Sequence, residues 1–406
     1  MNTHEIILKI TARLEESGLK TIFDKLKKQF GSALKPLASG LLKMTSAVYE
    51  VDTEMTALGK ATQETERKYL HFLDSASDSA NRLGRSVSDL IRQTSGWAKS
   101  GFDIGNAAKL AETSSIYTNI SGADNDAAVN SMSTAMNAFN IEAADSIAIV
   151  DKLNKLGREF TPSMENLGDG LSHSASALSD AGTGLDETLA MLAAGSDAAQ
   201  DAAGFGDFLA INSMRLRGMK EELEQLGEHA HESADSINKV QSQILNHTDG
   251  KIDIFDDAGA FGDYYEIMED IAQIYDTLSV SDRDSLADIL FGSSAKAKKQ
   301  GNALIEAFQS GQVQKALDAS LNAQGSAMEA QEKWLGSLEA KTQQFEAAFQ
   351  SLSNTVLDSD MLKWFLDLGT GGVKALDALA DKLGTFGTIG AGGLSAGTAA
   401  FVKNFA

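Results

Sequence analysis

Two histidines and one acidic cluster are the residues whose types could bind a metal ion. His229 and His231 are two positions apart in a predicted helix, so their side chains point about 200° apart and do not converge on one metal. The acidic cluster lacks the alternating oxygen ligands and terminal glutamate of an EF-hand, which favours a solvated loop. Its members are Asp253, Asp256, Asp257 and Asp263. The sequence therefore predicts no metal site.

Other chemical patterns are equally incomplete. The pairs Gly168-x-Gly170 and Gly204-x-Gly206 lack the third glycine and the preceding strand of a dinucleotide fingerprint, so neither predicts a phosphate cradle. No nucleophile elbow or local triad signature occurs. Glycosidase-like carboxylate pairing in space is not readable from sequence and stays open. Core packing is favoured over ligand stacking for the three tryptophans, Trp97, Trp334 and Trp364. We therefore expect no catalytic, cofactor-binding or metal-binding residues, and not an enzyme.

The elements around these residues are predicted to be helices throughout. Only two prolines, Pro36 and Pro162, occur in 406 residues, so long stretches meet no obligate helix breaker. The 36 glycines fall mostly between periodic segments, where they can end helices. The composition predicts an all-α fold with a compact multi-helix core and long amphipathic helices on its N- and C-terminal sides.

A helix-turn-helix unit is loosely duplicated in the core. The stretch from Leu83 to Tyr117 and the stretch starting at Leu156 both open with Leu-Gly-Arg and enter a Ser/Thr-capped helix. Each later passes through Gly, a bulky apolar residue and Asp into an Ala-rich helix. Asp103 and Asp186 are the expected N-caps of these second helices. Such a repeat is typical of a building element.

Two segments have coiled-coil spacing. From Leu41 to Leu83 apolar residues recur at alternating intervals of three and four, with Thr62 and Thr65 weakening the middle. The same alternation between Met328 and Val356 predicts one long helix of roughly 45 Å. Its apolar positions are Leu335, Leu338, Thr342, Phe345, Phe349, Leu352 and Val356. Each seam is a candidate for self-association or docking.

The predicted organisation has five parts. They are an N-terminal amphipathic helical segment (1–75), a duplicated helical core (76–245), a second helical part of the core (246–325), a long heptad helix (326–366) and a Gly-rich hydrophobic tail (367–406). Within the tail, residues 383–402 are uncharged and have the length of a bilayer span, but six glycines make them less apolar than a committed span. A Gly/Ala hinge or protein-buried helix is favoured over membrane activity.

Charge and cysteine content restrict the partners and the compartment. The net charge of −22 repels a phosphate backbone, so sequence-specific nucleic-acid binding is not expected. Residues 1–45 carry a net +4, which suits an acidic partner. The chain has no cysteine, and its N-terminus lacks the features of a secretory signal, so we expect a protein made in the cytoplasm.

Four collinear stretches resemble the core region of tail tape measure proteins of long-tailed bacteriophages and prophages. They are Leu83 to Tyr117, SIAIVDKLNKLGREFTPSMENLGDGLSHSASAL from Ser146, DDAGAFGDYYEIMEDIAQIYDTLSVSDRDSLADILFG from Asp256 and GSAMEAQEKWLGSLEAK from Gly325. The resemblance covers about residues 45–403. Family members typically continue beyond the block that resembles TFGTIGAGGLSAGTAAFVKN, so we expect a truncated product, a split reading frame or a degenerate prophage copy.

The resemblance implies a virion protein in the tail lumen that is assembled in the host cytoplasm, sets tail length and leaves with the DNA at ejection. Implied partners are tail tube, tail chaperone and tail-tip proteins, with self-association through the heptad helices. Transient host-membrane contact would involve residues 383–402. At ~1.5 Å per helical residue the whole chain measures at most roughly 600 Å.

Two alternatives stay open from the sequence. A secreted or membrane-disrupting helical effector would use the Gly-rich tail and amphipathic seams against a bilayer. An unassigned enzyme on a helical scaffold would need a pocket with converging titratable groups.

Overall fold

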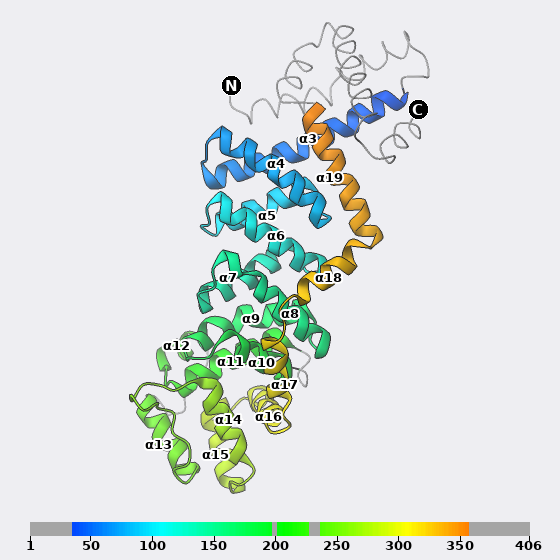
Figure 1. Ribbon diagram of the computed structural model, residues 1–406. Helices are drawn as coiled ribbons and strands as arrows, with labels where there is room; N and C mark the ends of the chain where they lie inside the picture. The colour runs from blue at the N-terminus through cyan, green and yellow to red at the C-terminus, as the bar shows by residue number, and fades with distance from the viewer. Residues whose placement is uncertain (1–34, 197–200, 227–235, 357–406) are drawn as a thin grey trace. The chain divides into compact units, whose positions relative to one another are not determined.

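The computed structural model describes residues 35–196, 201–226 and 236–356, and helices make up its regular structure (Figure 1). In chain order they are α3 (Lys35–Thr62), α4 (Glu66–Leu83), α5 (Val87–Lys99), α6 (Ile104–Ser121), α7 (Asn125–Phe139), η2 (Ala143–Asp145), α8 (Ile147–Glu159), α9 (Met164–Ser179), α10 (Leu185–Gly195), α11 (Ala202–Leu216), α12 (Lys220–Gln225), α13 (Ile237–His247), α14 (Tyr264–Tyr275), α15 (Val280–Phe291), α16 (Ala295–Gln309), α17 (Gln312–Leu321), α18 (Ser326–Leu335) and α19 (Leu338–Val356). The described residues form no strand beyond one bridge between Phe255 and Phe261. The predicted all-α fold is confirmed.

Contacts divide the chain into two compact units. The first comprises Met1–Ile91 with Thr342–Ala406, and the second comprises Arg92–Lys341. Among the described residues, α3, α4, the start of α5 and most of α19 belong to the first unit. The five-part division drawn from the sequence stays a prediction.

In the first unit, the predicted seam from Leu41 to Leu83 is carried by two helices rather than one. The chain leaves the helix between Thr62 and Glu66, where Gln63 has φ +51°. The Tyr69 hydroxyl holds this turn, since it accepts the Glu64 N–H at 2.8 Å and hydrogen-bonds the Thr62 hydroxyl at 2.7 Å. Most of the seam is nevertheless buried. Its buried members are Val48, Val51, Leu58, Phe72, Ala76 and Leu83.

The long helix predicted between Met328 and Val356 is interrupted. Helix α18 ends at Leu335, Gly336 follows, and α19 begins at Leu338. The expected face is also wrong for α19. The Leu338 and Phe345 side chains are 84% and 55% exposed, whereas the buried positions are Ala340, Ala347, Gln350 and Ser353. Heptad spacing identified the apolar residues, but small and polar side chains make the close contacts.

Gln350 shows why a polar residue lies on the buried face of α19. Its Oε1 accepts the backbone N–H groups of Val87 at 2.8 Å and Ser88 at 3.2 Å, and its Nε2 donates to the Ser88 hydroxyl at 3.1 Å and to the Glu50 carboxylate at 3.3 Å. The first N–H groups of a helix have no partner within that helix. Gln350 therefore caps α5 from more than 260 residues away in the sequence.

The duplicated helix-turn-helix units appear as α5–α6 and α9–α10. The Ser86 and Ser163 hydroxyls each accept an N–H three residues on, and Asp103 caps α6 through the N–H groups of Gly105 and Asn106, as predicted. The expected cap at Asp186 is wrong. Gly184 occupies the N-cap position of α10, and the Asp186 carboxylate pairs with a lysine instead.

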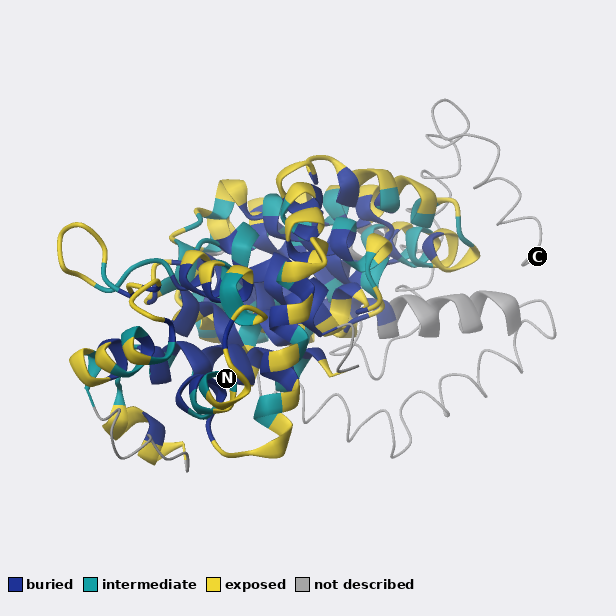
Figure 2. Ribbon diagram, turned by 90° about the horizontal axis from the view of Figure 1, so that it is seen from below, coloured by how far each residue is buried: buried dark blue, intermediate teal, exposed yellow. Residues whose placement is uncertain are grey.

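Within the second unit the chain runs from α6 to α16 and then turns back. Figure 1 shows α17 and α18 running back beside earlier helices, and their contacts are with α6, α8 and α10. Buried residues concentrate where helices face one another, with exposed residues on the outer turns (Figure 2). The largest fully buried side chains of this unit include Trp97, Tyr117, Phe205, Tyr264 and Phe291. This packing fixes the elements on which the following site depends.

Candidate functional site

Asp151 and Asn154 lie one turn apart on one face of α8 and hold the start of α18. Asp151 is 5% exposed, and its two carboxylate oxygens accept the backbone N–H groups of Gly325 at 2.9 Å and Ala327 at 2.7 Å. The Asn154 amide donates to the Ser326 carbonyl at 2.9 Å. Gly325, the N-cap residue of α18, has no side chain to satisfy these groups. Asp151 therefore acts as the cap of α18 from another helix.

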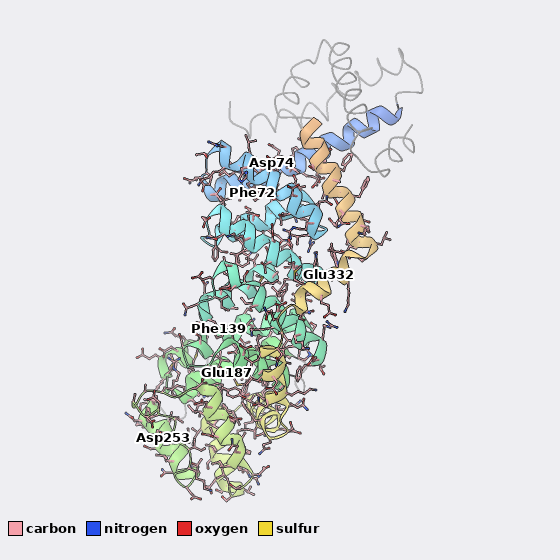
Figure 3. All side chains as sticks on the ribbon, in the orientation of Figure 1. Phe72, Asp74, Phe139, Glu187, Asp253 and Glu332 are labelled. Atoms are coloured by element: carbon pink, nitrogen blue, oxygen red, sulfur yellow. The ribbon has the colours of Figure 1, made fainter. Side chains whose placement is uncertain are left out.

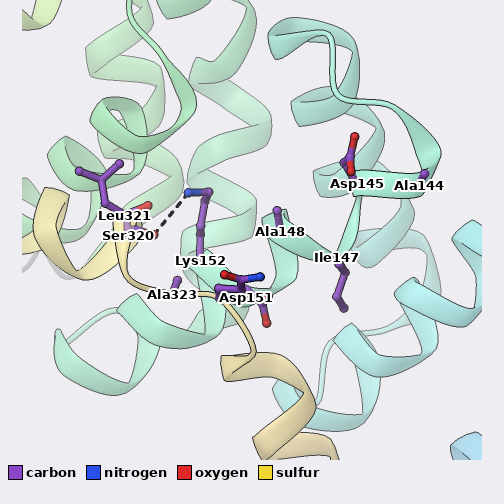
Figure 4. A pocket seen from close by; sticks show the side chains of 10 residues that line it. Ala144, Asp145, Ile147, Ala148, Asp151, Lys152, Ser320, Leu321 and Ala323 are labelled. Carbon is purple, nitrogen blue, oxygen red and sulfur yellow. Dashed lines mark hydrogen bonds between the residues drawn. The ribbon is translucent and has the colours of Figure 1, made fainter.

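Lys152, the next residue on α8, holds the end of α17. Its ammonium pairs with the Asp186 carboxylate and donates to the Ser320 carbonyl at 3.3 Å, the contact dashed in Figure 4. The Ser320 hydroxyl donates to the same Asp186 carboxylate. A positive charge near a helix C-terminus and a negative charge at an N-terminus both complement the helix dipole. We call Asp151, Lys152, Asn154 and Asp186 the α8 clamp.

A pocket of about 310 Å³ opens beside the α8 clamp (Figure 4). Small and apolar side chains, among them Ile147, Ala148 and Leu321, line much of it, together with Asp151 and Lys152. Both carboxylate oxygens of Asp151 are engaged by backbone N–H groups, and Lys152 is neutralised by Asp186. Asp151 and Lys152 thus hold helix ends together at the pocket, and Asp145 is an exposed carboxylate on its lining.

The acidic residues singled out in the sequence serve a loop and a helix start. Asp253 accepts from the Gln241 side chain and the Phe255 N–H, and Asp256 accepts from two N–H groups of the turn that follows. Asp263 caps α14 and accepts the Thr183 hydroxyl at 2.9 Å. Asp257 is exposed. Figure 3 shows Asp253 well apart from Glu187, another carboxylate of this unit. Within the described ranges, no group of three His, Asp or Glu residues could hold a metal ion.

The two Gly-x-Gly pairs lie where α9 crosses α11. A Cβ on Gly170 would lie 2.6 Å from the Ala202 carbonyl oxygen, and one on Gly206 would lie 2.3 Å from the Gly170 carbonyl oxygen. Gly168 leaves room for the Tyr117 hydroxyl, whose oxygen would lie 2.2 Å from an added Cβ. These glycines allow backbones to approach closely. Gly168, Gly170 and Gly206 are therefore positions of close packing.

Buried phenols accompany this core. Burial is the main reason that the pKa of Tyr117 is raised to about 12, and burial also raises the pKa of Tyr264. The Tyr264 hydroxyl donates to the Asn212 side chain at 2.6 Å, and Asn212 donates to the Leu290 carbonyl at 2.7 Å. Both phenols therefore stay protonated at neutral pH, where they act as hydrogen-bonding core residues.

A serine, an aspartate and a histidine meet between α13 and α15. The Ser279 hydroxyl donates to one Asp282 oxygen, and His247 Nδ1 lies 3.0 Å from the other. Hydrogen bonds from His247 and Ser279 lower the pKa of Asp282. A nucleophilic triad needs the imidazole next to the hydroxyl. Here the carboxylate stands between them, so the arrangement ties two helices and caps α15.

Comparison with known families identifies the chain's class. The family model described as phage-related minor tail protein matches residues 76–292, more than half of the chain. The chain belongs to the phage-related minor tail protein family. No solved structure matches it significantly.

Family membership makes the chain a component of a phage tail. The matched region includes both duplicated units and α8 with its clamp residues, and ends with the last residues of α15. The helices that the clamp holds, α17 and α18, follow that region. No helix among the described residues is long and apolar enough to cross a membrane. Residues 383–402, His229, His231 and Trp364 lie outside the described residues.

Sequence reasoning found the tryptophan environment but missed the clamp. Trp97 is fully buried and donates to the Ser114 hydroxyl at 3.1 Å, as expected of core packing, while Trp334 is half-buried. Asp151 and Lys152 were not singled out because they read as ordinary polar positions of an amphipathic helix. Gly325 after a helix is the one signal that α18 needs an external cap.

Proposed function

We propose that this minor tail protein is the core region of a tape measure protein. In this function it lies in the lumen of the growing tail, sets the length at which tube polymerisation stops, and leaves with the DNA at ejection. The observation that carries the proposal is the family match over a region built from helices. An α-helix converts residue number into distance at ~1.5 Å per residue, which is the property a molecular ruler needs.

The proposal also assigns the chain a non-catalytic function. Its charged groups at the α8 clamp are engaged in holding helix ends, and its buried phenols are hydrogen-bonded core residues. Tail tube, tail chaperone and tail-tip proteins are the proposed partners, and assembly takes place in the host cytoplasm. The net charge of −22 disfavours binding to the DNA that shares the tail lumen.

Insertions at the break between α18 and α19 test the ruler directly. Helix-forming inserts of two, four and six heptads after Gly336 would extend the chain by roughly 21, 42 and 63 Å if helical. This site leaves the buried faces of α18 and α19 in register within each helix. Tails of phages carrying each insert are measured by electron microscopy, and the expected result is a length that rises in proportion to the insert.

A matched control places the same inserts in the exposed turn at Gly259. An insert in this exposed turn leaves the helices on either side unchanged, so tail length should stay at the wild-type value. If all three inserts at Gly336 gave tails of wild-type length, in virions that contain the protein, this segment would not contribute to the ruler.

A further inference from the structure

Residues 312–337, comprising α17, α18 and the turns that flank α18, form a segment that we call the strap. The strap lies across α10, α8 and α6, on helices that precede it by more than 100 residues (Figure 1). It brings the chain back along earlier helices of the second unit. Its attachment to those helices therefore decides the path that the polypeptide takes.

The fully buried apolar residues of the strap are mostly small. Its buried aliphatic residues are Val313, Ala316, Ala319, Ala323 and Ala327. Among its larger side chains, Leu321 is 61% and Met328 is 44% exposed, whereas Leu317, Trp334 and Leu335 are half-buried. An alanine buries a single methyl group, and hydrophobic stabilisation follows apolar area. The fully buried apolar surface of the strap is therefore mostly alanine methyl groups.

Polar contacts add to the attachment, and the charge-assisted hydrogen bonds gather on α8. Two adjacent residues of α8 with opposite charges make these bonds. Lys152 donates to the Ser320 carbonyl at the end of α17, and Asp151 accepts two backbone N–H groups at the beginning of α18. Farther along, the Asn119 amide of α6 donates to the Gln331 side chain at 3.0 Å. Charge-assisted hydrogen bonds are stronger than neutral ones and are lost together when the partners separate.

The strap helices depend on their tertiary contacts. Each has ten residues, and helices of that length are marginal in water without tertiary contacts. We propose that the strap is a detachable element, latched by Asp151 and Lys152, which leaves the second unit while α9, α10 and α11 stay folded. Its 26 residues then reach roughly 85 Å when extended. The link of this reach to tail length rests on the proposed function, whereas detachment itself does not.

Hydrogen exchange of the whole chain in solution, read by mass spectrometry, tests the latch. In Asp151→Ala, peptides from residues 312–337 should exchange at least tenfold faster than in the wild type, with peptides from α9 and α11 changing less than twofold. Lys152→Met should give a smaller acceleration confined to the same peptides. Asp145→Ala is the matched control, because Asp145 is an exposed carboxylate lining the same pocket, and it should change neither set.

A second experiment separates release of the strap from general loosening. The chain has no cysteine, so Asn154→Cys with Ser326→Cys provides a unique pair that a short bis-maleimide can join. Joining the pair in the Asp151→Ala background should return strap exchange to the wild-type rate. Equal acceleration of the strap and of α9–α11 in Asp151→Ala, or none in either, would overturn the proposal. Neither measurement depends on whether the chain sets tail length.

Discussion

Helix α11 on α9 and the strap on α8 are two helix contacts of the same unit that use different chemistry. Where α9 meets α11, glycines bring backbones together, and large side chains such as Leu171, Phe205 and Leu209 are fully buried. The strap contact uses alanine methyl groups and a cluster of charged side chains. One folded unit therefore contains both a permanent joint and a releasable one.

The two contacts should respond differently to mutation because their energies are distributed differently. Close packing along a whole helix gives a contact that fails only when the surrounding core fails. A short element held by a few polar contacts opens locally, at a lower free energy than global unfolding.

Gly206→Ala should have the largest effect. Its new Cβ would lie 2.3 Å from the Gly170 carbonyl oxygen, which is backbone and cannot rotate away, so α9 and α11 must separate. We expect the free energy of unfolding to fall by ~3 kcal/mol or more, at the upper end of the costs of overpacking. Urea unfolding followed by circular dichroism measures it. Gly96→Ala is the control, because its Cβ meets nothing nearer than 3.9 Å, and the change should be neutral or stabilising by up to ~1 kcal/mol. Equal effects of the two substitutions would refute the close crossing.

Leu171→Ala should lower the same free energy by about 2 to 3 kcal/mol. Leu171 is fully buried on α9, and removing its methyl groups leaves a cavity. The neighbouring glycines and alanines allow partial collapse, which places the cost toward the lower end of the usual range. Exchange protection should fall throughout α9, α10 and α11 together. If protection fell only near residue 171, the crossing would not be one cooperative block.

Ala316→Gly should destabilise the strap alone, by about 1 to 2 kcal/mol. The substitution removes one fully buried methyl group and lowers helix propensity in the middle of α17. Exchange in residues 312–337 should accelerate roughly tenfold, while the midpoint of global unfolding stays unchanged. If the midpoint of global unfolding also fell, the strap and the core would unfold as one unit, and the strap would not be a separately releasable element.

Sequence reasoning succeeded where a structural signal was local. The N-cap at Asp103, the serine caps and the all-helical class follow from a few neighbouring residues, and all are confirmed. It failed at Asp186, which stands two residues into α10 and pairs with Lys152. The second unit offers that carboxylate a cation from another helix, and no short window of sequence contains both residues.

The same limit explains the error in α18 and α19. Heptad spacing places Leu338 and Phe345 on one stripe, and it is blind to the break at Gly336. The buried stripe contains Gln350 because the N-terminus of α5 requires an acceptor there. Gln350 and Asp151 supply caps from 263 and 174 residues away, and these become visible only when the helices are placed in space.

Glu187 connects the two contacts, because its helix α10 touches both α9 and α17. Its carboxylate accepts the Gly184 N–H at 2.7 Å, but burial, reinforced by the charges of Asp263 and Asp186, raises its pKa above the ordinary 4.5. The folded chain thus holds this proton more tightly than the unfolded chain does. The resulting stability is complete below the ordinary pKa and is lost as pH rises through the raised value.

Glu187→Gln should therefore make the chain slightly more stable than the wild type at pH 7, since a glutamine oxygen still accepts the Gly184 N–H without an ionised group. At pH 4 the two proteins should have nearly equal urea midpoints, so the difference between them grows with pH as Glu187 ionises. Glu332→Gln, the same exchange at an exposed position of the strap, should leave the midpoint difference flat (Figure 3). A Glu187→Gln variant that is less stable than the wild type at pH 7 would mean that the carboxylate stabilises the Gly184 N–H by more than its burial costs. The joint between α9, α10 and α17 would then depend on a carboxylate, as the α8 clamp does, and the two contacts would differ less than their packing indicates.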